Sequence, residues 1–363
     1  MRLHWRVLGL AALVAALMVG MGLSTAGVAA ASPASFKVIA SGLNNPRGLA
    51  FGHDGALYVA EAGKGGNQFC VNSPEGGQQC YGTTGSITRI AYGHQARIVT
   101  GLPSVAGSDG SQATGPVDVA PKTRGDVYAI IGGVAPDPAH PQLQRFGRLV
   151  HFNAWGKSYS IANLEAYEAK HNPDGQEINS NPNGLTYAGY GRFAVADAGA
   201  NDVLLVGANG HISTLAVFPA RQVTMANGQK VTVESVPTTV VRGPDGAYYV
   251  GELTGAPFVP GVARVYRIVP GHKPTVYAGG FTNIIDMAFG RDGKLYVLEI
   301  AKNGLASGDL TGALIKVDHH GKHTVASAGL VAPGGLAIGH DGYAYVSNYS
   351  IFAGQGQVVR IRL

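Results

Sequence analysis

The stretch GLAFGHDGALYVAEAG, residues 48–63, decides the fold, because the chain repeats it five more times with the same internal offsets. In each copy a short apolar run meets a turn, and a second β-rich run follows, as Leu57, Tyr58 and Val59 do here. Four of the six turns are Asp-Gly, in which glycine adopts positive φ and aspartate caps the turn. The pattern is therefore typical of a β-hairpin. The other copies begin at Val117, Gly184, Thr239, Asp286 and Gly335.

The repeat length indicates a propeller. Setting aside residues 1–31 of the 363 leaves six units of roughly 55 residues, the size of a four-stranded blade with its loops. The last unit ends one strand short at Leu363, and residues 35–43, SFKVIASGL, carry the missing pattern. We predict an all-β, six-bladed β-propeller of four-stranded blades formed by residues 35–363 as a single domain. Its N-terminal strand completes the last blade, which removes an exposed sheet edge.

The N-terminus predicts export. Arg2 and Arg6 precede an apolar run and then small residues ending at Ala31, which is typical of a secretory signal peptide over residues 1–31. A retained membrane anchor is the alternative. No later stretch has 18 uninterrupted apolar residues, so we expect no transmembrane span after signal cleavage and a secreted, extracytoplasmic protein. Loss of the two arginines takes the formal charge from +5 to +3, which gives no electrostatic case for nucleic acid.

The two cysteines, Cys70 and Cys80, lie in one loop rich in glycine, glutamine and asparagine. In an exported chain, two neighbouring cysteines predict a disulfide. Two thiols alone are too few for a structural metal site.

Loop lengths indicate which rim of the ring carries function. The hairpin turns are tight, whereas long loops, such as residues 62–84 and 163–182, lie where each first strand begins and each second strand ends. Counting outward from the turns places Arg47 opposite Glu61, and every equivalent pair is likewise separated by 14 positions. Because functional residues gather on loops above a rigid scaffold, we expect a site at this rim. The candidate residues of the channel mouth are Arg47, Glu61, Asp118, Asn183, Asp197, Thr238, Glu252, Asp286, Glu299 and Asn348.

These polar residues allow two interpretations. They could form an oxygen-rich ring that binds a hard cation, or supplies acid and base for a carbonyl or sugar substrate. Alternatively, each carboxylate accepts hydrogen bonds from loop amides of its own blade, a structural role repeated because the blade is repeated. The repeat is broken at Asn183, which places an amide where other units have different residues. It is also broken at Asp118 and Asp286, which replace the glycine or threonine of other units.

At these positions, where the repeat is interrupted, the chain resembles gluconolactonase-like six-bladed propellers. Those proteins take metal ligands from an Asn-Gly and an Asp-Gly at the starts of first strands. Asn183-Gly184 matches the first of these, whereas Asp286 precedes Met287 instead of glycine, and the first-blade glutamate motif has no counterpart. The resemblance implies Asn183 and Asp286 as ligands of a divalent cation, Ca²⁺ or Zn²⁺. Any other cofactor is open.

Long phrases of the sequence are similar to the ScyD/ScyE family, among them NNPRGLAFGHDGALYVAEAG, VPTTVVRGPDGAYYVGELTGAPF and FTNIIDMAFGRDGKLYVLEIAKNGL. These exported propellers are named for their association with genes for the pigment scytonemin. The resemblance covers nearly the whole mature chain and implies a propeller of the NHL and gluconolactonase-like group, without a settled activity. We therefore expect a secreted propeller that binds a small molecule, another extracellular ligand or a protein partner through the long-loop rim. The alternative is an enzyme, either a metal-assisted lactonase-like hydrolase or a sugar oxidoreductase, acting in the channel mouth.

Overall fold

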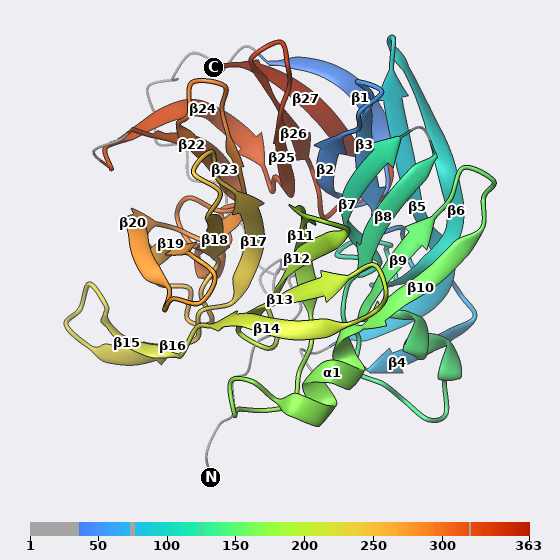
Figure 1. Ribbon diagram of the computed structural model, residues 1–363, viewed down its shortest axis with the longest axis horizontal. Helices are drawn as coiled ribbons and strands as arrows, with labels where there is room; N and C mark the ends of the chain where they lie inside the picture. The colour runs from blue at the N-terminus through green and yellow to red at the C-terminus, as the bar shows by residue number, and fades with distance from the viewer. Residues whose placement is uncertain (1–35, 73–76, 124, 319–320) are drawn as a thin grey trace, which may run out of the picture.

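Six four-stranded antiparallel sheets stand around a central axis in the computed structural model, which describes residues 36–72, 77–123, 125–318 and 321–363 (Figure 1). The predicted six-bladed β-propeller is confirmed. The predicted signal peptide, residues 1–31, lies outside the described residues. Within the described part of the chain, no helix has both the length and the apolar character needed to span a bilayer.

The strands follow the sequence repeats, and each blade runs from the axis outward. Blade 1 contains β2 (Pro46–Phe51), β3 (Leu57–Glu61), β5 (Gln78–Ala91) and β6 (His94–Ala106), with β4 (Phe69–Asn72) added to β5. Blade 2 contains β7 (Pro116–Thr123), β8 (Asp126–Ile131), β9 (Arg148–Phe152) and β10 (Ser158–Asn163). Blade 3 contains β11 (Pro182–Gly189), β12 (Arg192–Asp197), β13 (Asp202–Gly207) and β14 (Ile212–Val217).

Blade 4 contains β17 (Pro237–Arg242), β18 (Tyr248–Glu252), β19 (Ala263–Ile268) and β20 (Thr275–Phe281). Blade 5 contains β21 (Ile284–Phe289), β22 (Leu295–Glu299), β23 (Thr311–Val317) and β24 (His323–Val331). Blade 6 contains β25 (Gly335–Ile338), β26 (Tyr343–Asn348), β27 (Gly356–Arg362) and β1 (Lys37–Leu43).

The ring closes as the sequence predicts. Strand β1, from the N-terminal side, pairs antiparallel with the C-terminal strand β27 and supplies the outer strand of blade 6. The first strands contact one another in turn, from β2 to β7, β11, β17, β21 and β25 and back to β2, so they line the axis. Closure joins the two ends of the described chain in one sheet and leaves no gap in the ring.

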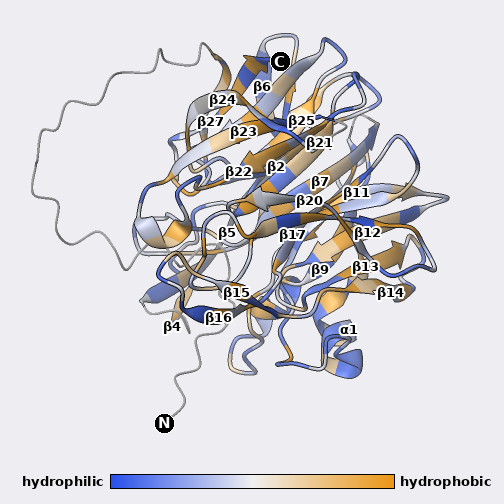
Figure 2. Cartoon of the chain, turned by 90° about the vertical axis from the view of Figure 1, so that its left-hand side faces the viewer, coloured by the Kyte–Doolittle hydropathy of each residue, from blue (hydrophilic) through white to orange (hydrophobic). Residues whose placement is uncertain are grey.

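The core lies between the blades. Each pair of neighbouring blades shares its own cluster of buried side chains, as Tyr58 and Ile87 of blade 1 do with Val127 and Phe152 of blade 2. The remaining blade pairs are packed in the same way, including blades 6 and 1, where Ala40 of β1 takes part. Figure 2 shows the apolar residues along these strands. The apolar residues of the repeat therefore form the faces through which neighbouring blades pack against one another.

The turn motif G-x-D-G-x-x-Y is explained by one local arrangement. In blade 1, Asp54 accepts a hydrogen bond from Tyr58 Oη at 3.1 Å and an ion pair from Arg89 on the third strand at 2.8 Å. A Cβ at Gly52 would lie 2.8 Å from the Tyr58 ring, so glycine lets the ring cross the turn. The same acid, tyrosine and base recur as Asp245, Tyr249 and Arg267; as Asp292, Tyr296 and Lys316; and as Asp341, Tyr345 and Arg360.

Three segments lie outside the regular four-stranded blades: α1, the β15–β16 hairpin and the β4 segment that carries the disulfide. Helix α1 (Leu164–His171) follows β10 and is capped at its start by Asn163. The hairpin of β15 (Arg221–Thr224) and β16 (Lys230–Val233) stands between blades 3 and 4. The predicted disulfide is confirmed, because Cys70 and Cys80 stand opposite each other in the β4–β5 pair and are joined.

Candidate functional site

Each of the first five inner strands begins with a β-bulge. The residues paired with the ends of the second strands are Pro46, Pro116, Pro182, Pro237 and Ile284, and the register shifts directly after each of them. The predicted pairing of Arg47 with Glu61 is therefore wrong by one residue, as are its equivalents in blades 2 to 5. A bulge sets two residues of one strand against one of its partner, so it turns the extra residue toward the axis.

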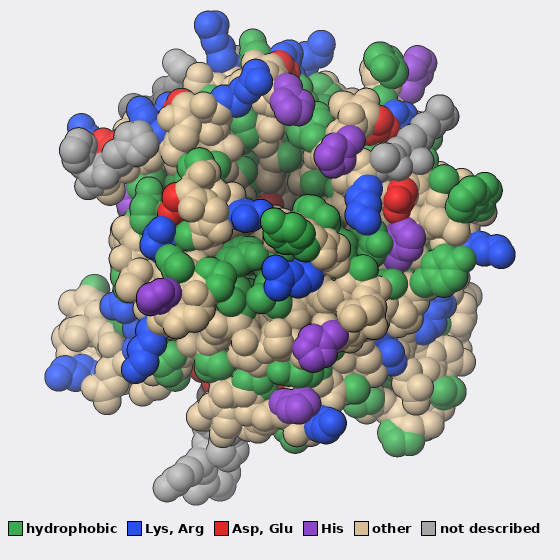
Figure 3. Space-filling view, viewed as in Figure 1, with side chains coloured by type: hydrophobic (Ala, Val, Ile, Leu, Met, Phe, Trp, Pro, Cys, Tyr) green, Lys and Arg blue, Asp and Glu red, His purple; other side chains and the backbone are tan. Residues whose placement is uncertain are grey.

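The bulges open into a narrow axial cavity. It is lined by residues at and directly after the five bulges and by Gly334, which precedes the inner strand of blade 6: Arg47, Gly48, Val117, Asp118, Asn183, Gly184, Thr238, Ile285, Asp286 and Gly334. The cavity has a volume of about 10 Å³, which is room for about one water or one bare ion. Figure 3 shows one face of the ring hollowed near its centre, with few acidic side chains at the surface there. A sugar ring does not fit inside this cavity and would have to bind above it.

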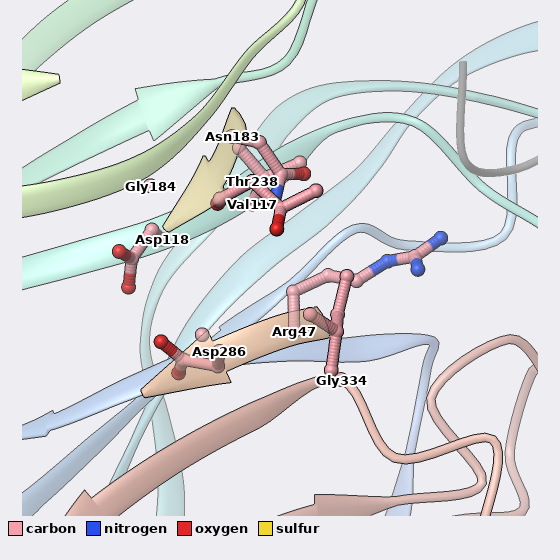
Figure 4. A pocket seen from close by; sticks show the side chains of 10 residues that line it. Arg47, Val117, Asp118, Asn183, Gly184, Thr238, Asp286 and Gly334 are labelled. Carbon is pink, nitrogen blue, oxygen red and sulfur yellow. Dashed lines mark hydrogen bonds between the residues drawn. The ribbon is translucent and has the colours of Figure 1, made fainter. Parts of the chain in front are cut away.

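Asp118 and Asp286, called the axial pair below, occupy the same position in blades 2 and 5. Because these blades are three apart in a ring of six, their inner strands lie on opposite sides of the axis. Figure 4 shows the two carboxylates facing one another. Asp118 accepts backbone N–H bonds from Val119 at 2.8 Å and from Leu185 of blade 3 at 2.7 Å.

Asp286 repeats this arrangement on the other side of the axis. It accepts bonds from the backbone N–H of Met287 at 2.7 Å and of Leu336, in blade 6, at 2.7 Å. It also accepts a bond from Thr239 Oγ1 of blade 4 at 2.8 Å. Each acid thus ties its own inner strand to the next one and presents its carboxylate to the cavity.

The surroundings of the axial pair favour the uncharged acids. Burial raises the pKa of Asp286 to about 6, against the lowering effect of its three hydrogen bonds. Burial and the charge of Asp286 raise the pKa of Asp118 well above its usual range. Arg47 does not offset these charges, because its guanidinium projects away from the acids and donates from Nη2 to Ala113 O at 2.8 Å (Figure 4). The two acids thus share a cavity in which the guanidinium of Arg47 is directed elsewhere, and this leaves a place for a positive charge between them.

The other candidates on the inner strands bind neighbouring blades. Asn183 donates from Nδ2 to Thr238 O at 2.9 Å, and Thr238 donates from Oγ1 to Ile284 O at 2.7 Å. Both residues line the axial cavity together with Arg47 and the axial pair. The remaining polar atom of the Asn183 side chain is its amide oxygen, a hard ligand of the same kind as a carboxylate.

The candidates at the ends of the second strands do not line the cavity. Each is buried and accepts a hydrogen bond from the residue 17 positions earlier, in the segment that leads into its own blade or its neighbour. These bonds, 2.6–2.8 Å long, join Asn44 N to Glu61, Ser180 Oγ to Asp197, Ser235 Oγ to Glu252, Thr282 N to Glu299 and Val331 N to Asn348. We call these five acceptors the cap residues. Their repetition follows from the repetition of the blade.

Two cap residues are further fixed by ion pairs. Glu61, fully buried, receives Arg97 Nε at 2.9 Å and Nη2 at 2.7 Å. Glu252, also fully buried, receives both terminal nitrogens of Arg221, which belongs to β15. The carboxylate oxygens of these two acids are occupied by donors from the protein itself, so these residues position loops.

The lining residues Gly48, Gly184 and Gly334 were not predicted from the sequence. A Cβ at Gly48 would lie 2.1 Å from Asp118 Oδ1, and one at Gly184 would lie 2.7 Å from Thr239 Cα. Glycine at position 48 thus gives Asp118 its space, and glycine at position 184 lets the inner strands of blades 3 and 4 approach closely. The sequence did carry a signal for the bulges that expose these residues, namely a proline one position before the predicted start of four inner strands. Proline at the first residue of a strand lacks the N–H that a regular ladder would use.

The donor set of the axial cavity fits a hard cation. Two carboxylates and an amide oxygen are the ligands that Ca²⁺ takes, and no histidine or cysteine lines the cavity, which argues against Zn²⁺. In the described residues, no group of three or more His, Cys, Asp or Glu is arranged to hold a metal ion. A cation bound by the axial pair would therefore complete its coordination with Asn183, backbone oxygens and water.

No family model and no curated protein matches this sequence. Its structure is similar to a gluconolactonase from Xanthomonas campestris, with a TM-score of 0.55, 9% identity, and coverage of 90% of this chain and 89% of that one. It is similar to a calcium-binding protein, regucalcin, from Agrobacterium tumefaciens, with a TM-score of 0.54, 13% identity, and coverage of 91% and 94%. It is also similar to the apo form of an aldose sugar dehydrogenase from Escherichia coli, with a TM-score of 0.53, 14% identity, and coverage of 90% and 98%. At such identities the likeness shows the gluconolactonase-like propeller fold, and the ScyD/ScyE resemblance stays a prediction.

Proposed function

We propose that this protein is a secreted binding propeller that holds a hard divalent cation, with Ca²⁺ the best match, between Asp118 and Asp286. The cation would contribute to binding an oxygen-rich ligand at the long-loop rim. One observation carries the proposal: two carboxylates face each other across a cavity the size of an ion, and the cationic residue that lines it, Arg47, directs its guanidinium away from them. The bulges that open the cavity lie at the same end of the blades as the long loops.

The test is Ca²⁺ binding measured by calorimetry on protein stripped with chelator and dialysed. The double variant Asp118→Asn, Asp286→Asn keeps the side-chain shape and should lose one equivalent of bound Ca²⁺ relative to the wild type. The matched control is Glu299→Gln, an acid on the same rim that accepts from Thr282 N in its own blade. It should keep that equivalent. Full retention of Ca²⁺ by the double variant would refute the axial site.

The pH dependence gives a second test of the axial site. Protons compete with the cation, and the pKa of Asp286 lies at about 6, so axial Ca²⁺ binding should weaken as the pH falls through 6. Without Ca²⁺ the folded chain keeps a proton on Asp286 that the unfolded chain releases near pH 4. The free energy of unfolding should therefore decrease as the pH rises from about 4 to 6. Asp286→Asn should flatten this slope. An unchanged slope would show that Asp286 does not titrate in this range.

A second candidate function is a lactonase-like hydrolase or sugar oxidoreductase. The pKa of Asp286, raised to about 6, supports it, because a carboxyl that titrates near neutral pH can accept a proton from an attacking water. The size of the cavity opposes it, since the substrate would have to bind above the acids. Hydrolysis of glucono-δ-lactone by Ca²⁺-loaded wild type, absent in Asp286→Asn, would favour the enzyme. Ca²⁺ binding without turnover would favour the binding protein.

A further inference from the structure

The rim opposite the long loops is basic. Strand direction places two turns of each blade at this end, one between its first and second strands and one between its third and fourth strands, together with the C-terminal end of β27. We call this end the turn rim. Figure 3 shows it, with lysine, arginine and histidine side chains spread over the face and few acidic ones among them. Five exposed cationic side chains of the turn rim form no ion pair with any described residue: Lys157, Arg192, Arg242, Lys273 and Arg362.

The acids of the turn rim are bonded to groups of the rim itself. Four of them form the ion pairs of the turn motif, which are 2.7–2.9 Å long: Asp54, Asp245, Asp292 and Asp341. Asp126 contacts His151 at 2.6 Å, and Asp318 accepts from Lys322 N at 2.9 Å. The cationic side chains that remain after these pairs form a surface that attracts an anionic partner.

Three aromatic side chains of the turn rim are almost fully exposed. Tyr92, in the β5–β6 turn, is 93% exposed, Trp155, in the β9–β10 turn, 85%, and Tyr190, in the β11–β12 turn, 95%. Tyr92 and Tyr190 have φ of 51° and 53°, a left-handed conformation that favours glycine and asparagine and is costly for a bulky side chain. Neither packing nor turn geometry requires tyrosine at these two positions. Exposed rings at a strained backbone therefore indicate contact with a partner.

A groove beside Tyr190 adds hydrogen-bonding groups. Its volume is about 580 Å³, within the range of about 300–1,000 Å³ that is typical of small-ligand sites. It is lined by Tyr190, Arg192, Leu205, Asn209, His211 and Ser213, among others. A guanidinium binds a carboxylate through two parallel hydrogen bonds, and amide and hydroxyl side chains can bond to the hydroxyls of a sugar. The groove thus combines an exposed ring, an unpaired cation and neutral polar groups.

A second guanidinium lies near the same turn. Nη1 of Arg242, in blade 4, lies 3.4 Å from the position that a Cβ at Gly189 would occupy, so Arg242 extends to the β11–β12 turn that carries Tyr190. Arg192 follows Tyr190 on the other side of that turn. The Tyr190 turn therefore has unpaired cations on both sides, one from its own blade and one from the next.

We propose that the turn rim binds an acidic polysaccharide, with one carboxylated sugar in the groove beside Tyr190. Arg192 would bind its carboxylate, the Tyr190 ring would pack on its apolar face, and Arg242 would attract the next acidic unit. A polysaccharide fits better than a lipid surface, because a flat surface would not enter the groove. It fits better than a nucleic acid, because the chain is predicted to be exported. The site lies at the opposite end of the ring from the axial pair and requires no cation there.

The experiment is a calorimetric titration of the full chain with an oligomer of galacturonate, in the presence of chelator so that Ca²⁺ in the axial cavity cannot contribute. Binding should weaken as the salt concentration rises, and a neutral galactose oligomer of the same length should not bind. Tyr190→Asn removes the ring and supplies a residue suited to positive φ, and Arg192→Gln removes the guanidinium. Each should weaken binding about tenfold. The matched control is Lys230→Gln, an exposed lysine on β16 at the long-loop rim, which should bind as the wild type does.

A comparison of anions separates sugar recognition from attraction between charges. Tyr190→Asn should bind polyphosphate, an anion without sugar rings, as tightly as the wild type does. The proposal is overturned if the wild type does not bind the galacturonate oligomer, or if both variants bind it as tightly as Lys230→Gln. It is also overturned if polyphosphate, single-stranded DNA or vesicles that contain phosphatidylglycerol bind the wild type as tightly as this oligomer. None of these outcomes bears on Ca²⁺ binding by the axial pair.

Discussion

Glu252→Gln tests whether the cap residues are structural. The Glu252 side chain is fully buried and accepts from Arg221 Nη1 at 2.9 Å, from Arg221 Nη2 and from Ser235 Oγ at 2.8 Å. Glutamine keeps one acceptor oxygen and turns an amide N–H₂ toward the guanidinium, so Arg221, with a side chain 14% exposed, loses its counter-charge and one bond. Breaking a buried ion pair from one side costs about 3–5 kcal/mol, and the retained oxygen reduces this to about 2–4 kcal/mol.

The assay is urea unfolding at pH 7.5, with stability compared at equal m-values. The matched control is Asp245→Asn in the same blade, where the pair with Arg267 is 2.7 Å long but both side chains are over one-third exposed. An exposed pair contributes about 0–1 kcal/mol, so the control should change stability little. If both variants lowered the free energy of unfolding by the same amount, the argument that burial makes the Glu252 ion pair important would be refuted. Loss of Ca²⁺ binding in Glu252→Gln with stability intact would place this acid in the site and refute its role as a cap.

Three further predictions concern the ring and its loop. Gly48→Ala should lower stability by about 1–3 kcal/mol and weaken Ca²⁺ binding, because the new Cβ would lie 2.1 Å from Asp118 Oδ1; unchanged calorimetry would contradict this. Cys70→Ser with Cys80→Ser should cost up to about 3 kcal/mol in urea unfolding, and no change would mean that the loop is fixed without its disulfide. Deletion of residues 36–43 should abolish cooperative unfolding, because the partner of β27 is lost; a truncated chain that unfolds with the original m-value would disprove closure by β1.

The fold could be predicted from the sequence because each blade carries its own turn chemistry. The Asp-Gly turn, the tyrosine four residues after the aspartate and the apolar strands recur together, and each element is local in the chain. The register could not be predicted by counting outward from a turn, because a bulge adds a residue to one strand without changing the hydrophobic pattern near the turn. Proline at positions 46, 116, 182 and 237 was the signal for this irregularity.

The site could be predicted only in part, for a related reason. The rim was located by loop length, and Asp118, Asn183 and Asp286 were identified because they break the repeat. The cap residues were grouped with them, because sequence alone does not show which donors an acid meets. Donors to Glu61 and Glu252 come from Arg97 and Arg221, more than 30 positions away in each case.

The position of the axial pair argues that the pair, and not each acid alone, is the functional unit. The equivalent position is glycine at 48, 184 and 335 and threonine at 239, so an acid is not required for an inner strand to form. If each aspartate served only to hold the next blade, any spacing around the ring would do. The two aspartates lie in blades 2 and 5, which are three apart, and this is the separation that places two inner strands on opposite sides of the axis. Gly48 leaves the space that Asp118 occupies. Burial, and for Asp118 the charge of Asp286, raise the pKa values of both acids, and a cation bound between them would allow both to ionise, which is the basis of the proposed axial site.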